Sequence, residues 1–135
     1  MITYTTDAVN ISDDQLQGFF VGWGNPPSSQ TMLKLLTQSD YIVLALDSET
    51  NHVVGFISAV SDHTLSAYIP FLEVLPAYQN NNIGTELTKQ MLNLLKDYYM
   101  VDLLCDADVQ SFYEKVGMKK ANGMMLRNYD KQSGK

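Results

Sequence analysis

The polar loop that follows Pro76 is the segment whose residue types best fit a chemical role. Three asparagines, Asn80 to Asn82, precede Gly84 and the start of an amphipathic pattern. Asparagine and glycine tolerate left-handed backbone, which lets consecutive N–H groups point into one concavity. The positive end of the following helix favours anions such as phosphate or pyrophosphate at that place. The pattern predicts an anion site, and the alternative is an ordinary polar loop before a helix.

Residues that usually act as nucleophiles or metal ligands are few. Cys105 is the single cysteine, which excludes an internal disulfide and a zinc site built on thiolates. We interpret it as a buried small residue, because its neighbours are apolar. His52 and His63 stand at the ends of expected strands, without the partner pattern of a triad or a metal site. No metal is therefore expected.

Helices and strands must position this loop. Ser12 and the acids after it form a capped helix start, and a second helix ends near Gln38. Apolar residues spaced three, four or seven apart predict a helix from Ile83 to about Tyr98. The remaining patterns predict strands at 41–46, 53–60, 65–75 and 101–105, a helix at 109–116, and a hairpin of 118–121 and 124–129 around Asn122-Gly123. The order α-α-β-β-β-α-β-α-β-β, with room for a short N-terminal strand, predicts an α/β fold with a mixed sheet.

Length, composition and charge exclude several classes of protein. The 135 residues, 45% apolar and 18% charged, fit one domain spanning 1–135 and neither a disordered chain nor a membrane protein. The first residues lack the pattern of a secretory signal, so we expect a cytoplasmic protein. Residues 1–88 carry a net charge of −8 and residues 89–135 one of +2, without the basic stripe of a nucleic-acid binder.

Two motifs resemble those of a known superfamily. Gln79-Asn80-Asn81-Asn82-Ile83-Gly84 is similar to motif A of the GNAT (GCN5-related) N-acetyltransferases, Gln/Arg-x-x-Gly/Ala-x-Gly/Ala, with Asn82 at the first glycine position. Phe112-Tyr113-Glu114-Lys115-Val116-Gly117-Met118 resembles the superfamily's C-terminal Phe-Tyr-x-x-x-Gly-Phe signature. The order of elements also agrees, so the resemblance covers nearly the whole chain. It implies the GNAT-type fold, with a mixed, mostly antiparallel central sheet flanked by helices.

The resemblance implies transfer of an acetyl group from acetyl-CoA to an amine by direct attack in a ternary complex. Backbone groups near Leu72 and Val74 would bind the pantetheine arm. The pyrophosphate would be held by the amides of Gln79, Asn80, Asn81, Asn82, Ile83, Gly84 and Thr85. The loop lacks the arginine or lysine usual in the family, which predicts weaker CoA binding, and Lys89 and Lys115 are the nearest candidates for a phosphate contact.

Two residues are the candidate catalytic groups of this reaction. An alkyl ammonium must lose a proton before it attacks, and Glu73, on the strand that would line the site, is the candidate base. The alternatives for Glu73 are that it grips the substrate or faces water. Tyr113 occupies the position that the family uses for the acid that protonates the leaving thiolate. The alternative for Tyr113 is a tyrosine packed against the sheet.

The acceptor is expected to be a small, cationic primary amine, because the first 88 residues are acidic. Trp23 is a candidate aromatic wall of its pocket, and Asp106, with Asp102 and Asp108, could attract the amine or merely solvate a strand end. A homodimer is expected from exposed edges of the C-terminal hairpin. Two other classes remain open: a non-catalytic GNAT-fold module that binds CoA or a metabolite as a sensor or partner domain, and a structural interaction protein that binds no CoA.

Overall fold

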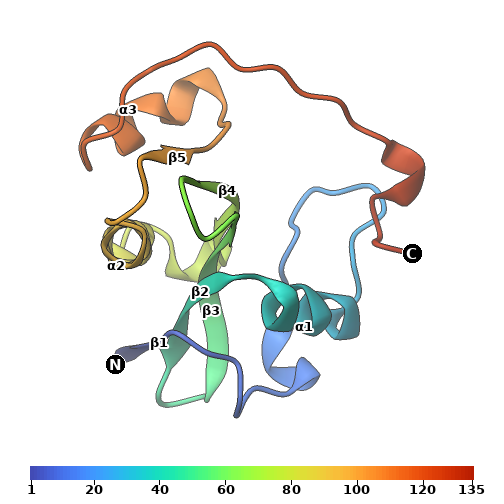
Figure 1. Cartoon of the computed structure of the whole chain (residues 1–135). Helices are drawn as coiled ribbons and strands as arrows, with labels where there is room; N and C mark the ends of the chain where they lie inside the picture. Colours follow the sequence, from blue (N-terminus) through green and yellow to red (C-terminus); the bar gives the residue numbers. More distant parts are fainter.

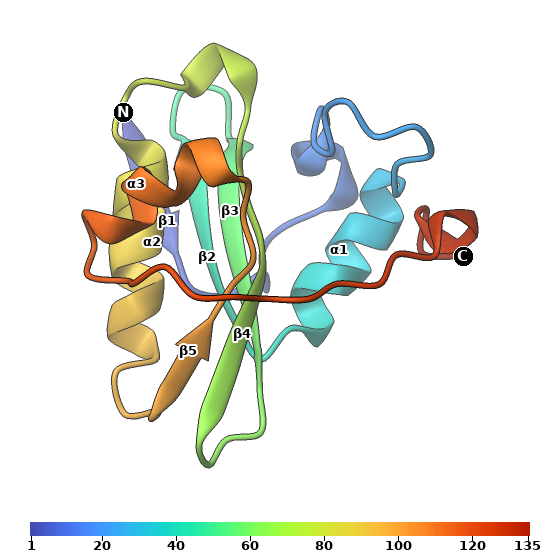
Figure 2. The same cartoon turned by 90° about the horizontal axis from the view of Figure 1, so that it is seen from above.

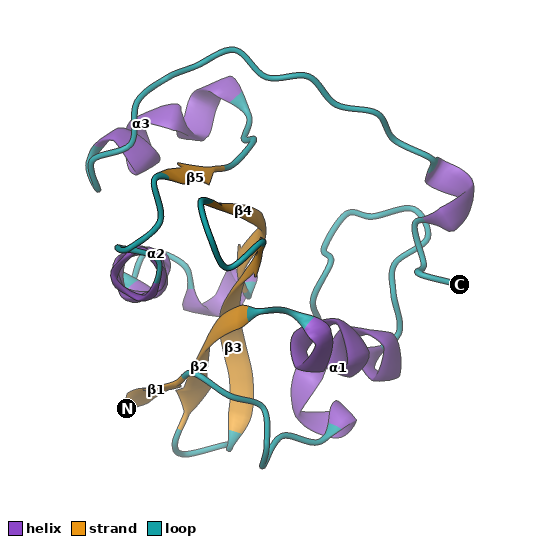
Figure 3. Cartoon of the chain, in the orientation of Figure 1, coloured by secondary structure: helices purple, strands orange, loops and turns teal.

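A five-stranded sheet forms the centre of the computed structural model, which describes all residues from 1 to 135 (Figures 1 and 3). The strands lie in the order β1-β2-β3-β4-β5. The pairs β1–β2, β2–β3 and β3–β4 are antiparallel, and β5 is parallel to β4. This confirms the α/β fold with a mostly antiparallel sheet and the short N-terminal strand. The bounds of the strands are β1 Ile2–Thr5, β2 Tyr41–Asp47, β3 His52–Ser61, β4 Ser66–Val74 and β5 Met100–Asp102.

Helices cover both faces of this sheet. The helices are α1 (Ser29–Gln38), α2 (Ile83–Leu94) and α3 (Gln110–Glu114). Figure 1 shows α1 on one side of the strands and α2 on the other. Successive side chains of a strand point to opposite faces of the sheet, so the two faces can pack against different helices. On β2, Val43 packs in one hydrophobic cluster with residues of α2, and its neighbour Leu44 packs in another with residues of α1. Both residues are fully buried.

The two strands nearest the candidate site diverge. β5 pairs only with Ser66, Ala67 and Tyr68 at the start of β4. The second half of β4, up to Val74, therefore has β3 on one edge and no strand on the other, an arrangement that can be followed in Figure 2. This half-strand leads through a 3₁₀ turn, Pro76–Tyr78, into the polar loop and α2. The open edge and the loop therefore adjoin one another.

Several predicted elements are shorter than the sequence indicates. The first predicted helix is a single 3₁₀ turn, Asp13–Leu16, because the chain turns out of it at Gly18, which has a φ of 93°. The strand predicted at 101–105 ends at Asp102, and the helix predicted at 109–116 is a 3₁₀ turn, Ala107–Val109, followed by α3. Gly117 does adopt the left-handed conformation, with a φ of 99°, that ends this helical segment.

The predicted C-terminal hairpin is wrong for the single chain. Residues 118–128, which we call the C-terminal arm, contain no helix or strand and run from the end of α3 across the molecule toward α1 (Figures 1 and 2). Beyond the arm, a 3₁₀ turn at Tyr129–Lys131 brings Gln132 to the loop before α1, where it accepts a hydrogen bond from the Asn25 N–H at 2.8 Å. The Asn-Gly turn residues are present, but residues 119–127 form no backbone–backbone hydrogen bond that would pair two strands.

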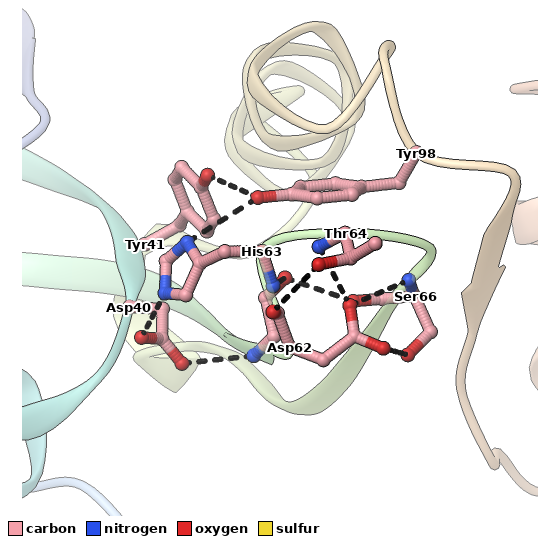
Figure 4. Close-up of polar contacts among 8 residues, drawn as sticks. Asp40, Tyr41, Asp62, His63, Thr64, Ser66 and Tyr98 are labelled. Carbon is pink, nitrogen blue, oxygen red and sulfur yellow. Dashed lines mark hydrogen bonds and ion pairs between the residues drawn. The ribbon is translucent and has the colours of Figure 1, made fainter.

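The turn between β3 and β4 carries a polar cluster (Figure 4). The Asp62 carboxylate accepts hydrogen bonds from three backbone N–H groups of this turn, which hold the pKa of Asp62 far below its ordinary value. His63 bonds the Asp40 carboxylate at 2.8 Å, and this contact, with the Ser61 N–H, lowers the pKa of Asp40. The cluster lies on an exposed surface, so we interpret it as a set of hydrogen bonds that stabilises the turn.

No helix in the chain is both long enough and apolar enough to cross a bilayer.

Candidate active site

The loop before α2 presents a row of free backbone donors. The N–H groups from Asn80 to Thr85 donate no hydrogen bond to any protein acceptor. The next N–H group, that of Glu86, donates to the Asn82 carbonyl as in a regular helix. Asn80 and Asn82 both have a φ of 66°, in the left-handed region that the sequence predicts for these asparagines. Six consecutive unsatisfied donors at the positive end of a 12-residue helix fit an anion such as pyrophosphate.

Close packing holds this loop against the open edge of β4. The side-chain amide of Gln79 donates to the Val74 carbonyl at 3.1 Å, so Gln79 ties the loop back to the strand. Gly84 lies under the ring of Phe112 on α3, because a Cβ built there would be 3.7 Å from that ring and 3.8 Å from a Val74 methyl group. The helix start, the end of β4 and α3 therefore meet at one place, and the residues present fit the phosphate and pantetheine arm of CoA.

An aromatic cavity of about 400 Å³ lies beside this edge. Leu72, Val74 and Gln79 line it from the side of the open β4 edge and the polar loop. Its aromatic wall consists of Phe20, Trp23 and Phe71, with ring centroids of Phe20 and Trp23 4.8 Å apart and those of Phe20 and Phe71 6.1 Å apart. Such a cavity, apolar with one charged group, has the composition of a small-molecule site.

Glu73 is that charged group, and it anchors the loop that carries Phe20 and Trp23. The Phe20 N–H donates to Oε1 of Glu73 at 2.9 Å, and the Val21 N–H donates to Oε2 at 3.2 Å. Phe20 has a φ of 63°, a strained conformation for a bulky residue, and the two carboxylate contacts hold it there. A carboxylate has about four lone-pair positions, so two remain for another partner.

Tyr113 lines a second, larger cavity of about 1060 Å³ between β5, α3 and the C-terminal arm. Burial, with a smaller contribution from the nearby Cys105 thiol, raises the pKa of Tyr113 to about 12. The tyrosine hydroxyl is thus a stable proton donor at neutral pH. Cys105 itself is exposed, so its interpretation as a buried residue is wrong; β5 ends at Asp102, and Cys105 therefore lies outside the sheet.

The predicted site residues thus fall into three groups. Leu72, Val74 and Gln79 line the cavity of Trp23 and Glu73, with the rest of the loop following Gln79, whereas Tyr113 lines the other cavity, which shares no lining residue with the first. Asp106 lies exposed before α3, lines neither cavity and makes no side-chain hydrogen bond. Sequence reasoning missed the aromatic walls Phe20 and Phe71. A signal was available for Phe71, which stands two residues before Glu73 on the same strand.

Comparisons with known proteins agree with this geometry. The model of the acetyltransferase (GNAT) family matches residues 8–118, which is most of the chain. The chain belongs to this family. The crystal structure of a Deinococcus radiodurans R1 protein, assigned as an acetyltransferase, is similar with a TM-score of 0.94 and 44% identity, over 98% of this chain and 92% of that one. A GNAT-family acetyltransferase of Streptococcus pneumoniae TIGR4 has a TM-score of 0.76 and 31% identity, over 95% and 98%.

Relatives found by sequence are longer proteins. The uncharacterized N-acetyltransferase ycf52 of Gracilaria tenuistipitata var. liui is 27% identical over 114 residues, 81% of this chain and 62% of that protein. The chain therefore spans about three fifths of the length of this relative. The solved structure of AAC(6')-Iy holds a bisubstrate analogue of CoA and monomethyl-acetylneamine; at 12% identity and a TM-score of 0.68 it shares only the fold.

Proposed function

We propose that this protein is an acetyl-CoA-dependent N-acetyltransferase, a single domain that moves the acetyl group to the primary amine of a small cationic acceptor. The observation that carries the proposal is the row of six free N–H groups from Asn80 to Thr85, next to an open strand edge. These donors would hold the pyrophosphate, and the unpaired edge at Leu72 and Val74 would bind the pantetheine arm. Acetyl-CoA supplies the activated acetyl group. The absence of lysine and arginine from this loop predicts modest affinity.

The acceptor would lie in the aromatic cavity. A cation over the faces of Trp23 and Phe71 is attracted by their ring quadrupoles, and the Glu73 carboxylate adds a full negative charge. Together they favour an amine that carries a positive charge before reaction. Asp106 is exposed outside both cavities, so its role here would be long-range attraction of the cation.

Glu73 would also receive the proton that the amine must lose. An alkyl amine with a pKa near 10.4 is neutral in only about one molecule per thousand at pH 7.4, which costs roughly 4 kcal/mol. The two lone-pair positions of Glu73 that the loop leaves free can accept this proton directly or through one water. The neutral nitrogen then attacks the thioester carbonyl, forming the C–N bond as the C–S bond breaks, and the nitrogen releases its second proton to solvent.

Tyr113 would stabilise the departing thiolate. With the pKa of Tyr113 raised to about 12, full transfer of its proton to a thiolate with the ordinary pKa near 8.5 is uphill by on the order of 5 kcal/mol. We therefore propose that its hydroxyl donates a hydrogen bond to the developing thiolate, which takes its final proton from solvent. Such a bond to a charged group is worth about 1.5–3 kcal/mol, or roughly a 10- to 100-fold effect on the rate.

The test is formation of an acetylated amine, followed by mass spectrometry across a panel of polyamines, aralkylamines and amino sugars. We expect turnover that requires both acetyl-CoA and the amine, with Tyr113→Phe slower by 10- to 100-fold at an unchanged dissociation constant for acetyl-CoA. Binding of acetyl-CoA without turnover of any amine would instead favour the second candidate, a CoA-binding sensor or partner module. The observation that favours this second candidate is the loop, which lacks a basic residue.

A further inference from the structure

A tyrosine and a carboxylate meet at the base of the polar loop. The Tyr78 hydroxyl donates a hydrogen bond of 2.7 Å to Oδ2 of Asp47. Tyr78 is the last residue of the 3₁₀ turn that leads into the loop, and Asp47 is the last residue of β2. The two residues are 31 positions apart in the sequence, so this contact ties the loop to a strand near the middle of the sheet.

Asp47 is a rigidly held acceptor. It is buried, and it pairs with Ile2 of β1 on one side and with His52 of β3 on the other. Its second oxygen, Oδ1, accepts the Glu49 N–H at 3.0 Å, which closes the turn after β2. The hydrogen bond between the two side chains lowers the pKa of Asp47 and raises the pKa of Tyr78. The carboxylate is therefore charged and the phenol protonated at neutral pH, the combination that gives a strong hydrogen bond.

The backbone of Tyr78 is in turn a support for the loop. Its carbonyl accepts a hydrogen bond from the side-chain amide of Asn81 at 3.2 Å, and the same amide donates to the Gln79 carbonyl at 3.3 Å. Asn81 stands between the two left-handed residues, Asn80 and Asn82, whose backbone angles determine where the free N–H groups point. The position of Tyr78 therefore affects the position of these donors.

We propose that Tyr78 and Asp47 are positioning residues, whose hydrogen bond holds the free N–H groups of residues 80–85 in the arrangement that binds a pyrophosphate. This inference rests on the proposed function, which gives the loop a pyrophosphate to bind. The other side-chain tie between the loop and the sheet is the exposed contact of Gln79 with the Val74 carbonyl. Without the Tyr78 hydroxyl, the bound pyrophosphate would have to order the loop itself, and the free energy spent on this ordering lowers the affinity.

The opposite end of β2 offers a matched control. The hydroxyl groups of Tyr41 and Tyr98 form a hydrogen bond of 2.6 Å (Figure 4). Tyr41 is the first residue of β2 and Asp47 the last, so Tyr41 lies at the end of the strand that is remote from the loop. Tyr41→Phe therefore removes one tyrosine hydroxyl and one hydrogen bond from the same strand as Tyr78→Phe does, and leaves the loop unchanged. A general loss of stability would affect both variants alike.

The first experiment is calorimetric titration of the wild type, Tyr78→Phe and Tyr41→Phe with acetyl-CoA. We expect the dissociation constant of Tyr78→Phe to be raised roughly 5- to 10-fold and that of Tyr41→Phe to equal the wild-type value. The KM of Tyr78→Phe for acetyl-CoA should rise with kcat unchanged, because the pyrophosphate takes no part in the chemical step. If the wild type and Tyr78→Phe bind acetyl-CoA equally well, or if Tyr41→Phe is weakened as much as Tyr78→Phe, this inference alone is overturned. A wild type that binds no acetyl-CoA would overturn the proposed function, and the inference with it.

The second experiment, a double-mutant cycle, assigns the effect to the hydrogen bond itself. Asp47→Ala removes the acceptor of the Tyr78 hydroxyl and also the contact with the Glu49 N–H. Because one hydrogen bond can be lost only once, adding Tyr78→Phe to Asp47→Ala should change the dissociation constant for acetyl-CoA by less than about twofold. Asp47→Asn keeps a carbonyl oxygen as acceptor, so its affinity should lie between those of the wild type and Asp47→Ala. A double variant weakened by the product of the two single effects would contradict the inference.

Discussion

Replacing Glu73 by alanine should release the loop that carries Phe20 and Trp23. The substitution removes both acceptors of the Phe20 and Val21 N–H groups, at 2.9 and 3.2 Å. Hydrogen bonds to a charged group contribute about 1.5–3 kcal/mol each, but the Val21 contact is exposed to solvent, so we expect a net loss of about 2 kcal/mol. That loss raises the population of the open loop roughly 30-fold, and Phe20 can then leave its left-handed conformation.

Fluorescence measures this release directly, because Trp23 is the single tryptophan of the chain. Opening of the loop should shift its emission to longer wavelength and increase quenching by iodide, since Trp23 is 37% exposed in the closed loop and packs against Phe20. Glu73→Gln, which keeps one carbonyl acceptor, should fall between alanine and the wild type. The matched control is Glu49→Ala, an exposed glutamate whose carboxylate accepts no hydrogen bond. If Glu73→Ala and Glu49→Ala give the same emission and quenching, the anchoring role of Glu73 is refuted.

Three further predictions concern the loop, the tyrosine and the acid stability. Asn82→Gly should bind acetyl-CoA as tightly as the wild type, whereas Asn82→Ala should bind about fivefold more weakly in calorimetry, because a left-handed alanine costs about 1 kcal/mol more; equal affinities would contradict this. Because the pKa of Tyr113 is raised to about 12, the ratio of kcat between wild type and Tyr113→Phe should stay constant from pH 7 to 10.5, and a fall centred near pH 10 would exclude the raised pKa. The pKa of Asp62 is lowered by hydrogen bonds, so its contribution to stability is present above pH 4 and is lost as the pH falls below that. In thermal melts Asp62→Asn should therefore be less stable than the wild type at pH 7, with a difference that shrinks toward pH 2; a difference that does not depend on pH would count against this assignment.

Local patterns in the sequence predicted most of the fold. Short, nearly continuous apolar runs at 41–46 and 53–60 placed two central strands that are buried on both faces, and the three-to-four-residue spacing from Ile83 placed α2. The failures lie where partners are distant or missing. Asn122-Gly123 is a strong turn signal, yet an isolated two-stranded hairpin is only marginally stable and needs a further strand beside it. The edge of β5 could supply that strand, but the single chain leaves this edge unpaired, and no local sequence pattern shows this.

The candidate site was predictable to a similar degree. The left-handed asparagines at 80 and 82 follow from residue type alone, as does the row of free donors before α2. The attachment of Glu73 to the backbone of Phe20, 53 residues away, depends on tertiary packing that spacing does not reveal. For the same reason, the sequence indicated a carboxylate at the site but not that two of its lone-pair positions are already used.

Hydrogen–deuterium exchange with and without acetyl-CoA tests the central claim most directly. The N–H groups from Asn80 to Thr85 have no protein acceptor, so they should exchange quickly in the free protein and slow down when the pyrophosphate accepts their hydrogen bonds. Acetyl-pantetheine, which has no pyrophosphate, serves as the control and should leave residues 80–85 unprotected. Protection of 80–85 by acetyl-CoA alone is the result that we predict. Saturating acetyl-CoA with no protection of this loop, or equal protection by acetyl-pantetheine, would contradict the account.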